Sequence, residues 1–324
     1  MSHGIDESTG KPAMAYVGER PWHGLGEKLE KGQPLEVWMG AARLNWEIER
    51  KPVQYLVEGK LRTMDDRFVL SRSDSGAALS IVSGSYCIVQ PREVIEFYRD
   101  LVSQYGYTLE TAGALDGGRK IWALAKTGKT SEIGRGAGDT LEAYVLLATS
   151  CDKTLATTAA FTSVRVVCQN TLFFAIDDVR RAKRPEIKVA HDSRFNALRV
   201  KVDLGLIDSA WSDFLSKADR MASRQMKKPD LESFFDELLG KTKDKSLSAR
   251  AQKERETLLS LMGSAPGQNL ATAKDTLWGA VNAVSYFVDH VRAAGQGPRL
   301  DSSWFGIGCH LKNAAWTKAC SMMQ

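Results

Sequence analysis

"TLEAYVLLATSCDKTLATTAAFTSVRVVCQN", residues 140–170, is typical of two β-strands joined by a short turn at Asp152 and Lys153. Apolar and small side chains recur along both halves with the period of two that strands show. A connection this short joins neighbours that run antiparallel. The stretch therefore predicts an antiparallel sheet at the centre of the fold.

The same period extends back to Trp46 and predicts three more strand pairs. "WEIERKPVQYLVEGKLRT" predicts a strand, a turn at Lys51-Pro52 and a second strand ending at Gly59. A second hairpin has Asp74, Ser75 and Gly76 at its tip, and a third turns at 116–118. The polar, Gly-rich residues 128–139 predict a loop.

One helix interrupts the strands, at residues 91–106. Pro91 suits the first turn of a helix, apolar residues recur at i, i+3 and i+4, and Gly106 suits the position after the last turn. After Asn170 the pattern becomes helical, most clearly at residues 272–294. We expect an α+β fold, with a mostly antiparallel sheet and a packed helix in the N-terminal half, followed by a helical C-terminal part.

These patterns predict three regions. Residues 1–45 form an N-terminal arm with a short helix, residues 46–178 form the antiparallel α+β core, and residues 179–324 form a basic, mostly helical region that packs on the core. A hydrophobic content of 43% with 26% charged residues is an ordinary globular balance. No apolar run is long enough to span a bilayer, and the polar N-terminus lacks the apolar segment of a secretion signal. Five dispersed cysteines without C-x-x-C spacing indicate reduced thiols, so we expect a cytoplasmic protein with no membrane partner.

The net charge of +5 is concentrated in one quarter of the chain. Residues 179–256 contain 19 Lys and Arg against 13 Asp and Glu, a surplus of 6, so the remainder is close to neutral. The basic clusters lie at 180–188, 224–228 and 241–245. Such clusters suit either a phosphate-binding surface or the solvated faces of helices.

No stretch predicts catalysis. The chain has no phosphate-binding loop with a lysine, no H-E-x-x-H, no G-x-S-x-G, and its histidines lack ligand spacing. Asp65-Asp66, Asp177-Asp178 and Glu142 could bind magnesium, but adjacent residues on a strand point apart. We therefore expect no catalytic residues, no cofactor and no metal site, and an enzyme is the third of three hypotheses.

Arg165 lies between two valines of the first stretch quoted. Alternation places Val164, Val166 and Cys168 on one side of the strand, which we expect to be core, and Arg165 with Ser163 and Gln169 on the other, mixed side. A guanidinium is suited to a phosphate or to a carboxylate. Both alternatives remain open for Arg165.

Two other places combine basic and aromatic residues. Arg119 and Lys120 follow a predicted turn, and alternation puts Lys120, Trp122 and Leu124 on one face. That face suits either a nucleic-acid platform or a sheet covered by a helix. In "RPWHGLG", residues 20–26, Trp22 and His23 could stack on a base, or Trp22 could pin the N-terminal arm to the body.

Several motifs occur together in order: "RPWHGLG", "GRKIWALA", "TSVRVVCQNTL", "IKVAHDSR" and "LWGAVNAVSYFVDHVR…LDSSWFG". As a set they resemble the phage/plasmid-like protein family, a family of unknown function carried on phages, prophages and plasmids, over nearly the whole chain. The resemblance supplies no catalytic residues, and it implies a mobile-element setting in which DNA is commonly handled. The order of strands and helices is also similar to single-strand annealing proteins of the RecT/Redβ type, in architecture only.

The preferred hypothesis is a mobile-element protein that binds single-stranded nucleic acid, in strand annealing or DNA protection. We expect it to be a homo-oligomer. The candidate binding residues are Arg165, Arg119, Lys120, Trp122, Trp22, His23, Arg180, Arg181, Lys183, Arg184, Lys227 and Lys228. The alternative is a non-enzymatic interaction or structural protein of phage or plasmid biology without nucleic-acid affinity, in which the basic clusters are solvated or contact acidic partners.

Overall fold

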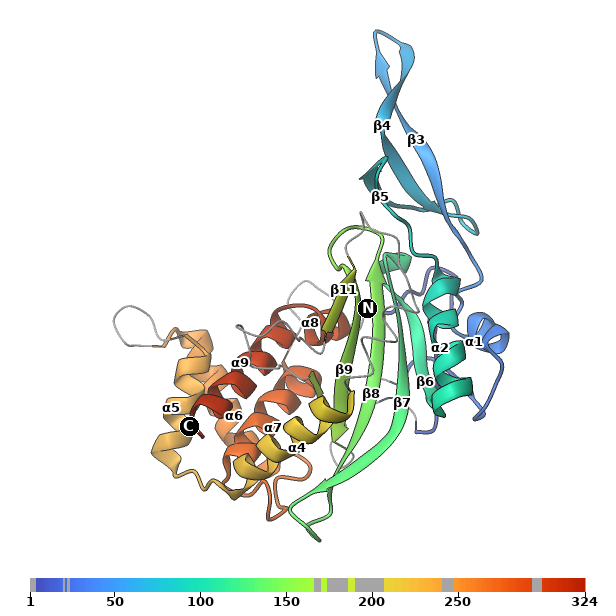
Figure 1. Cartoon of the computed structure of the whole chain (residues 1–324). Helices are drawn as coiled ribbons and strands as arrows, with labels where there is room; N and C mark the ends of the chain where they lie inside the picture. Colours follow the sequence, from blue (N-terminus) through green and yellow to red (C-terminus); the bar gives the residue numbers. More distant parts are fainter. Residues whose placement is uncertain are drawn as a thin grey trace.

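The computed structural model of the chain describes residues 4–19, 21, 24–165, 170–173, 186–189, 207–240, 247–292 and 299–323. A long antiparallel sheet lies at its centre, with helices around it (Figure 1). The predicted α+β class is confirmed: strands dominate the first half and helices the second.

The main sheet has eight strands in the order β10-β9-β8-β7-β6-β1-β2, and β11 pairs with β9 beyond this path. All described pairs in it are antiparallel except β1 with β2. Its strands are β1 (Met14–Val17), β2 (Glu27–Leu29), β6 (Thr108–Leu115), β7 (Lys120–Ile133), β8 (Asp139–Ser150), β9 (Thr157–Arg165), β10 (Asn170–Phe173) and β11 (Glu186–Val189). Because β1 and β2 belong to this sheet, the N-terminal residues are part of the body.

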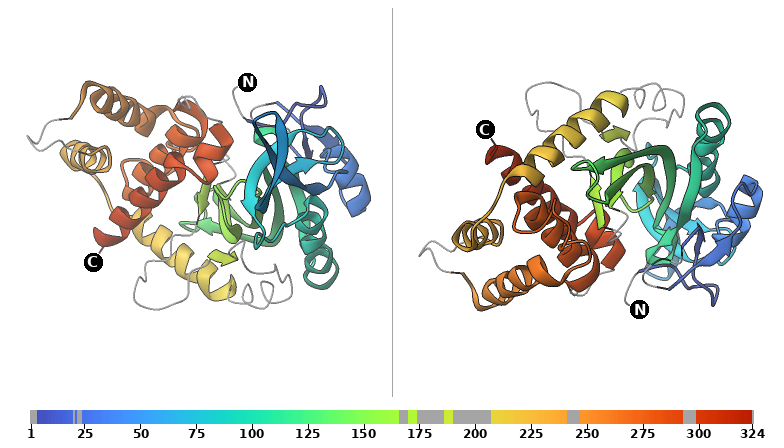
Figure 2. Two further views of the ribbon diagram at one scale, coloured as in Figure 1. Left: turned by 90° about the horizontal axis from the view of Figure 1, so that it is seen from above. Right: turned by 90° about the horizontal axis from the view of Figure 1, so that it is seen from below.

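Helices cover one face of this sheet almost completely. The tyrosine Tyr98 of α2 donates its hydroxyl to the carbonyl oxygens of Ala123 and Val145, which fixes α2 across β7 and β8. In Figure 2 the C-terminal helices and α2 lie toward opposite ends of the sheet, and residues of both groups belong to one apolar core. The helical elements are α1 (Leu35–Ala41), α2 (Pro91–Tyr105), η1 (Asp116–Gly118), α4 (Ile207–Ser223), α5 (Lys228–Leu238), α6 (Ala249–Ser264), α7 (Leu277–Tyr286), η2 (Phe287–Val291), α8 (Arg299–Trp304) and α9 (Ile307–Ser321).

The opposite face of the sheet has a second, smaller core. Trp122, Leu124 and Leu146 point into it from β7 and β8, and Leu300 of α8 packs against them. The predicted placement of Trp122 and Leu124 on one face is thus confirmed, and Ile121 beside Trp122 belongs to the core under α2. Both faces of the sheet are therefore covered.

A second sheet of three strands, β3 (Ile48–Val57), β4 (Lys60–Arg72) and β5 (Ala78–Ser83), stands apart from the first. Its β3–β4 hairpin projects from the body (Figure 1). We call residues 50–67 of this hairpin the β3–β4 arm. Most side chains in the arm are exposed, in contrast to those of the main sheet.

The hairpin at Asp74 to Gly76, the turn at Asp116 to Gly118 and the helix at 91–105 are confirmed. The turn expected at Lys51-Pro52 is wrong: β3 continues to Val57, and the chain turns at Glu58 and Gly59, both with positive φ. Pro52 is tolerated because β3 is an edge strand with an irregularity at that residue. The loop expected at 128–139 is shorter, since β7 continues to Ile133.

Candidate nucleic-acid interface

Arg165, at the end of β9, is completely buried, with 0% of its surface exposed. Its Nε and Nη2 atoms donate to the two carboxylate oxygens of Asp139, at 2.5 and 2.7 Å, and Nη2 also donates to the carbonyl oxygen of Gly267. The two-pronged contact is the geometry in which a guanidinium binds a carboxylate most strongly. Of the two ligands left open for Arg165, a phosphate or a carboxylate, the structure shows an internal carboxylate.

Asp139 also accepts hydrogen bonds from residues in α7 and just before it. Its Oδ2 atom accepts hydrogen bonds from Thr272 at 2.6 Å and from the indole of Trp278 at 2.9 Å. The expectation that the Arg165 side of β9 faces away from the core is wrong, because Ala159 and Phe161 on that side belong to the larger core. Alternation separates the two sides but does not show that helices cover this one.

Lys120 and Trp122 are also turned inward. The Lys120 ammonium pairs with Asp301 of α8 at 2.5 Å. Trp122 is 1% exposed and meets Trp304 of α8 edge to face, with ring centroids 5.0 Å apart. Of the two interpretations of this face, the structure shows the sheet covered by a helix. Neither side chain is therefore on the surface, where a nucleic-acid platform would need it.

Arg119 is half exposed and partly held. Its Nε donates to the carbonyl oxygen of Leu79 at 2.9 Å, and Nη1 lies 3.4 Å from Asp116. A pair this exposed adds little stability. Arg119 thus keeps one guanidinium edge toward solvent.

Trp22, His23, Arg180, Arg181, Lys183 and Arg184 lie outside the described residues. Lys227 and Lys228, in contrast, are described and exposed. They stand at the junction of α4 and α5, where the Lys227 backbone N–H donates to Asp230 and so caps α5. Of the six candidates that the structure describes, Lys227 and Lys228 are therefore the two that are exposed.

Two arginines that the predicted set lacks lie beside these lysines. Arg220 and Arg224 are one helical turn apart at the end of α4 and line a hollow with Asp219, Ser223 and Met323. Arg220 donates to the carbonyl oxygen of Met323 at 2.7 Å, and Arg224 donates to that of Met322. Among the described residues no carboxylate forms an ion pair with either guanidinium. The i, i+4 spacing of the two arginines was the signal available in the sequence.

The basic junction, as we name Arg220, Arg224, Lys227 and Lys228, has two acidic neighbours, Asp230, which caps α5, and Asp219. The Asp219 carboxylate accepts a hydrogen bond from the backbone N–H of Gly134, at 3.0 Å, in the loop between β7 and β8. The surface is consequently rich in unneutralised donors. Phosphate oxygens are the ligands that such donors bind.

A group of ionisable residues lies elsewhere on the main sheet. Lys126 pairs with Glu142, and the Tyr144 hydroxyl donates to Glu142 at 2.9 Å. Glu110 lies near both, and burial raises the pKa of its carboxyl. Glu142 is thus already bound by two side chains, and within the described residues no group of three or more His, Cys, Asp or Glu is placed to hold a metal ion.

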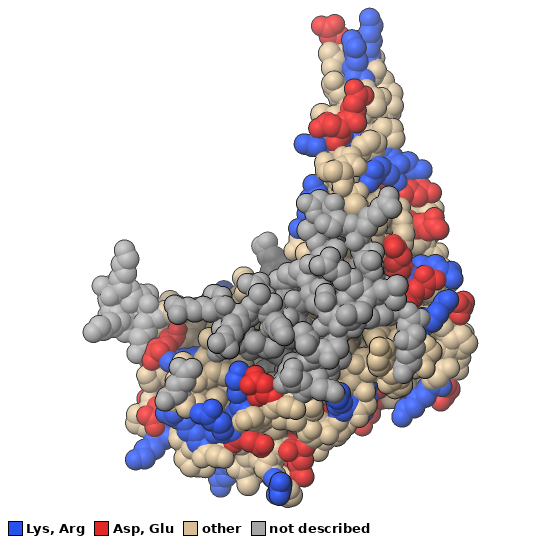
Figure 3. All heavy atoms as spheres, in the orientation of Figure 1, with Lys and Arg blue, Asp and Glu red and all other residues tan. Residues whose placement is uncertain are grey.

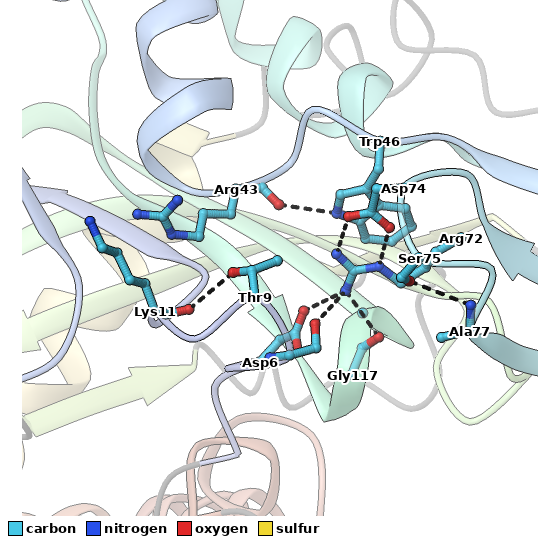
Figure 4. Close-up of polar contacts among 12 residues, drawn as sticks. Asp6, Thr9, Lys11, Arg43, Trp46, Arg72, Asp74, Ser75, Ala77 and Gly117 are labelled. Atoms are coloured by element: carbon cyan, nitrogen blue, oxygen red, sulfur yellow. Dashed lines mark hydrogen bonds and ion pairs between the residues drawn. The ribbon is translucent and has the colours of Figure 1, made fainter.

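The root of the β3–β4 arm is held by a second buried arginine. Arg72 donates to Asp6, to Asp74 and to the carbonyl oxygen of Gly117, and its guanidinium lies 4.3 Å from the centre of the Trp46 ring (Figure 4). The hydrogen bonds from Arg72 hold the pKa of Asp74 below its usual range. Arg72 therefore ties the second sheet to the N-terminal segment and to the turn before β7.

The four described cysteines, Cys87, Cys151, Cys309 and Cys320, are free. Burial raises the pKa of the Cys151 thiol to about 12, so this thiol is held in its unreactive form. None of the helices in the described ranges is both long and apolar enough to cross a membrane.

Neither the curated proteins nor the solved structures contain a match to this chain. Residues 78–312 match a family described as a domain of unknown function, DUF932. The match begins at β5 and extends into α9, so it includes the main sheet from β6 onward, α2 and the basic junction, and it leaves out the β3–β4 arm. The chain belongs to the DUF932 family.

Proposed function

We propose that this protein binds single-stranded nucleic acid through the basic junction, and that it serves phage or plasmid elements in strand annealing or DNA protection. The observation that carries the proposal is the pair formed by Arg220, in the last turn of α4, and Arg224, directly after it, both exposed and without a carboxylate partner among the described residues. The mobile-element setting is supported by the resemblance of the sequence motifs to the phage/plasmid-like proteins.

The geometry of the junction suits a chain of phosphates better than one isolated anion. Arg220 and Arg224 each use part of the guanidinium on a carbonyl oxygen near the C-terminal end of α9, and each keeps further N–H groups for another ligand. Lys227 and Lys228 follow Arg224 in the sequence and add two exposed cationic side chains. Donors spaced along a surface in this way can contact successive phosphates of one strand.

The preference for a single strand rests on the architectural similarity to annealing proteins. Base stacking, which single-strand binding commonly uses, would need exposed aromatic side chains. Trp122 and Trp304 are engaged with one another. Of the aromatic residues in the predicted set, Trp22 and His23 therefore keep the proposed stacking role, and they lie outside the described residues.

Fluorescence anisotropy with a labelled single-stranded oligonucleotide, over a series of salt concentrations, tests the proposal. We expect binding at low salt that weakens steeply as salt rises, with a slope of about −0.7 per phosphate contact. In the variant Lys227→Glu/Lys228→Glu, affinity should fall and the slope should become shallower, because fewer phosphates are then neutralised by the protein. Binding that ignores salt, or an absence of binding at low salt, would refute the proposal.

A matched control has the same change of charge on the other side of the molecule. Lys28 and Lys31 lie near α1, which Figure 1 shows on the side of the sheet away from α5, and both are exposed. Lys28→Glu/Lys31→Glu should leave the slope near that of the wild type. If both double variants weaken binding equally, overall charge and not the junction is responsible.

One observation favours a second candidate, an interaction protein of phage or plasmid biology without nucleic-acid affinity. The β3–β4 arm exposes large apolar side chains, among them Leu56 at 71% and Leu61 at 61%. Exposed apolar surface of this kind marks sites of protein contact. Retained binding of a protein partner by the Lys227→Glu/Lys228→Glu variant, with no affinity for oligonucleotides in the wild type, would favour this candidate.

A further inference from the structure

The β3–β4 arm has no apolar core of its own. Tyr55, Val57 and Met64 lie on one face, because Tyr55 pairs with Arg62, Val57 with Lys60 and Met64 with Val53 across the hairpin. Leu56 and Leu61 pair with each other on the opposite face. These five apolar side chains are all exposed. A two-stranded hairpin with apolar side chains on both faces is marginal alone and gains stability when further strands join it.

The outer edge of β4 in the arm is an unpaired strand. β5 pairs with β4 only from Arg67 to Ser71, and β3 occupies the other edge of β4. Residues 60–66 therefore present one row of backbone groups with no strand beside it among the described residues. This segment contains neither Pro nor Gly. Such an edge is a template for pairing with another strand.

The charges of the arm distinguish a protein partner from a nucleic acid. Along residues 50–67 the basic residues are Arg50, Lys51, Lys60, Arg62 and Arg67, and the acidic residues are Glu58, Asp65 and Asp66. Both signs lie side by side on the projecting hairpin (Figure 3). A phosphate-binding surface would carry one sign, so this mixture favours a surface of mixed charge as the partner.

The order of charges along β4 is complementary to that of a second copy of the same chain. Lys60 and Arg62 are near the turn, and Asp65 and Asp66 follow toward the root. Two copies of this strand, paired antiparallel about a two-fold axis, place the basic half of each beside the acidic half of the other. Asp66 also forms an ion pair with Arg67 at 3.1 Å, but both side chains are exposed and such pairs are weak.

We propose that two copies of this chain associate through the β4 edge of their arms and form a continuous four-stranded antiparallel sheet. Pairing brings the apolar side chains of both copies onto the two faces of one sheet, so Met64 lies near Met64 of the partner subunit, whereas Tyr55 stays on the outer strand β3. The interface is isologous and closes on itself. The proposal does not depend on nucleic-acid affinity.

The anchoring of the arm supports this role. Arg50 donates to the carbonyl oxygen of Tyr86 at 2.5 Å, and Arg72 joins the second sheet to Asp6. The root is thereby held while the tip extends away from both apolar cores. A strand presented on a fixed base loses less conformational freedom when it pairs.

Charge swaps on β4 test the proposal, because each of two variants alone should fail to dimerise while a mixture of the two should dimerise. Lys60→Glu/Arg62→Glu makes residues 60–66 wholly acidic, and Asp65→Lys/Asp66→Lys makes them wholly basic. Each variant alone should dissociate at least about tenfold more readily than the wild type, because like charges then face one another. An equimolar mixture should form a heterodimer. Masses are measured by sedimentation equilibrium and native mass spectrometry.

Circular dichroism and thermal unfolding show whether the variants fold, which we expect because the changes are far from both cores. A monomeric wild type at every concentration reached would overturn the proposal. So would variants that dimerise as the wild type does, or a mixture that contains only monomers. Anisotropy on the monomeric variants then reports nucleic-acid affinity separately, so the two proposals can fail independently.

Discussion

The hairpin β7–β8 and the hairpin β3–β4 begin from similar sequence patterns and reach opposite environments. Both are long antiparallel pairs with apolar and polar residues mixed along each strand. Almost every residue of β8 is buried, whereas almost every residue of β3 is exposed. The difference lies in the elements that cover them, since α2 and α8 close over β7–β8 and no described helix covers the arm. A strand's alternation thus defines its two sides, and the rest of the fold decides what each side contacts.

The largest contrast should come from arginines in the two environments. Arg165→Met leaves Asp139 as a buried charge, so the free energy of unfolding should fall by about 3–5 kcal/mol. Arg62→Met in the exposed arm should change it by less than about 0.5 kcal/mol at protein concentrations low enough to keep the chain monomeric. Urea unfolding measures both. The double variant Arg165→Met/Asp139→Leu should regain part of the loss, and equal effects of the two single variants would contradict the contrast.

Aromatic residues should show a smaller contrast in the same direction. Trp122→Ala leaves a cavity between the sheet and α8, so the free energy of unfolding should fall by about 3–5 kcal/mol. The loss is smaller where neighbouring side chains move to fill the cavity. Tyr55 is 46% exposed, so Tyr55→Ala should change the free energy of unfolding of the monomer only slightly. Thermal unfolding at low protein concentration compares the two. A large loss for Tyr55→Ala under those conditions would mean that the arm packs on its own body.

The smallest effect is a pH dependence at Glu110. Burial raises the pKa of this carboxyl, so the folded state holds the proton more tightly than the unfolded state. The resulting stability is present at pH values below the unfolded pKa and is lost as pH rises through the folded pKa. As pH rises from acid to neutral, the stability of Glu110→Gln should therefore increase relative to that of the wild type. Unfolding in urea at several pH values measures this, with Thr63→Ser in the arm as control, and a constant difference would contradict it.

The sequence predicted the fold class and most turns because these depend on local patterns. Asp116 to Gly118 and Pro91 to Gly106 were confirmed since Gly and Pro fix the local backbone. Pro52 misled because only the position of β3 at a sheet edge makes a proline acceptable there. Local pattern does not reveal which strand is at the edge.

The candidate site was less predictable, because burial depends on contacts between distant segments. Arg165 pairs with an acid 26 residues before it and also donates to Gly267, 102 positions later, in the connection between α6 and α7. Lys120 meets Asp301 across 181 residues. No spacing rule links such positions, so an arginine on a strand gives the same pattern whether it binds phosphate or carboxylate. Lys227 and Lys228 could be predicted as exposed because charged runs at helix ends are ordinarily solvated.

Photochemical cross-linking tests the central claim most directly, namely that the exposed basic junction, and not the buried basic residues of the sheet, contacts nucleic acid. A single-stranded oligonucleotide with a diazirine group on every second backbone position is bound at low salt and irradiated, and the modified peptides are identified by mass spectrometry. We predict cross-links in the peptides that contain residues 220–228, reduced in Lys227→Glu/Lys228→Glu. Cross-links confined to β7 and β9, or none at the junction, would contradict the account.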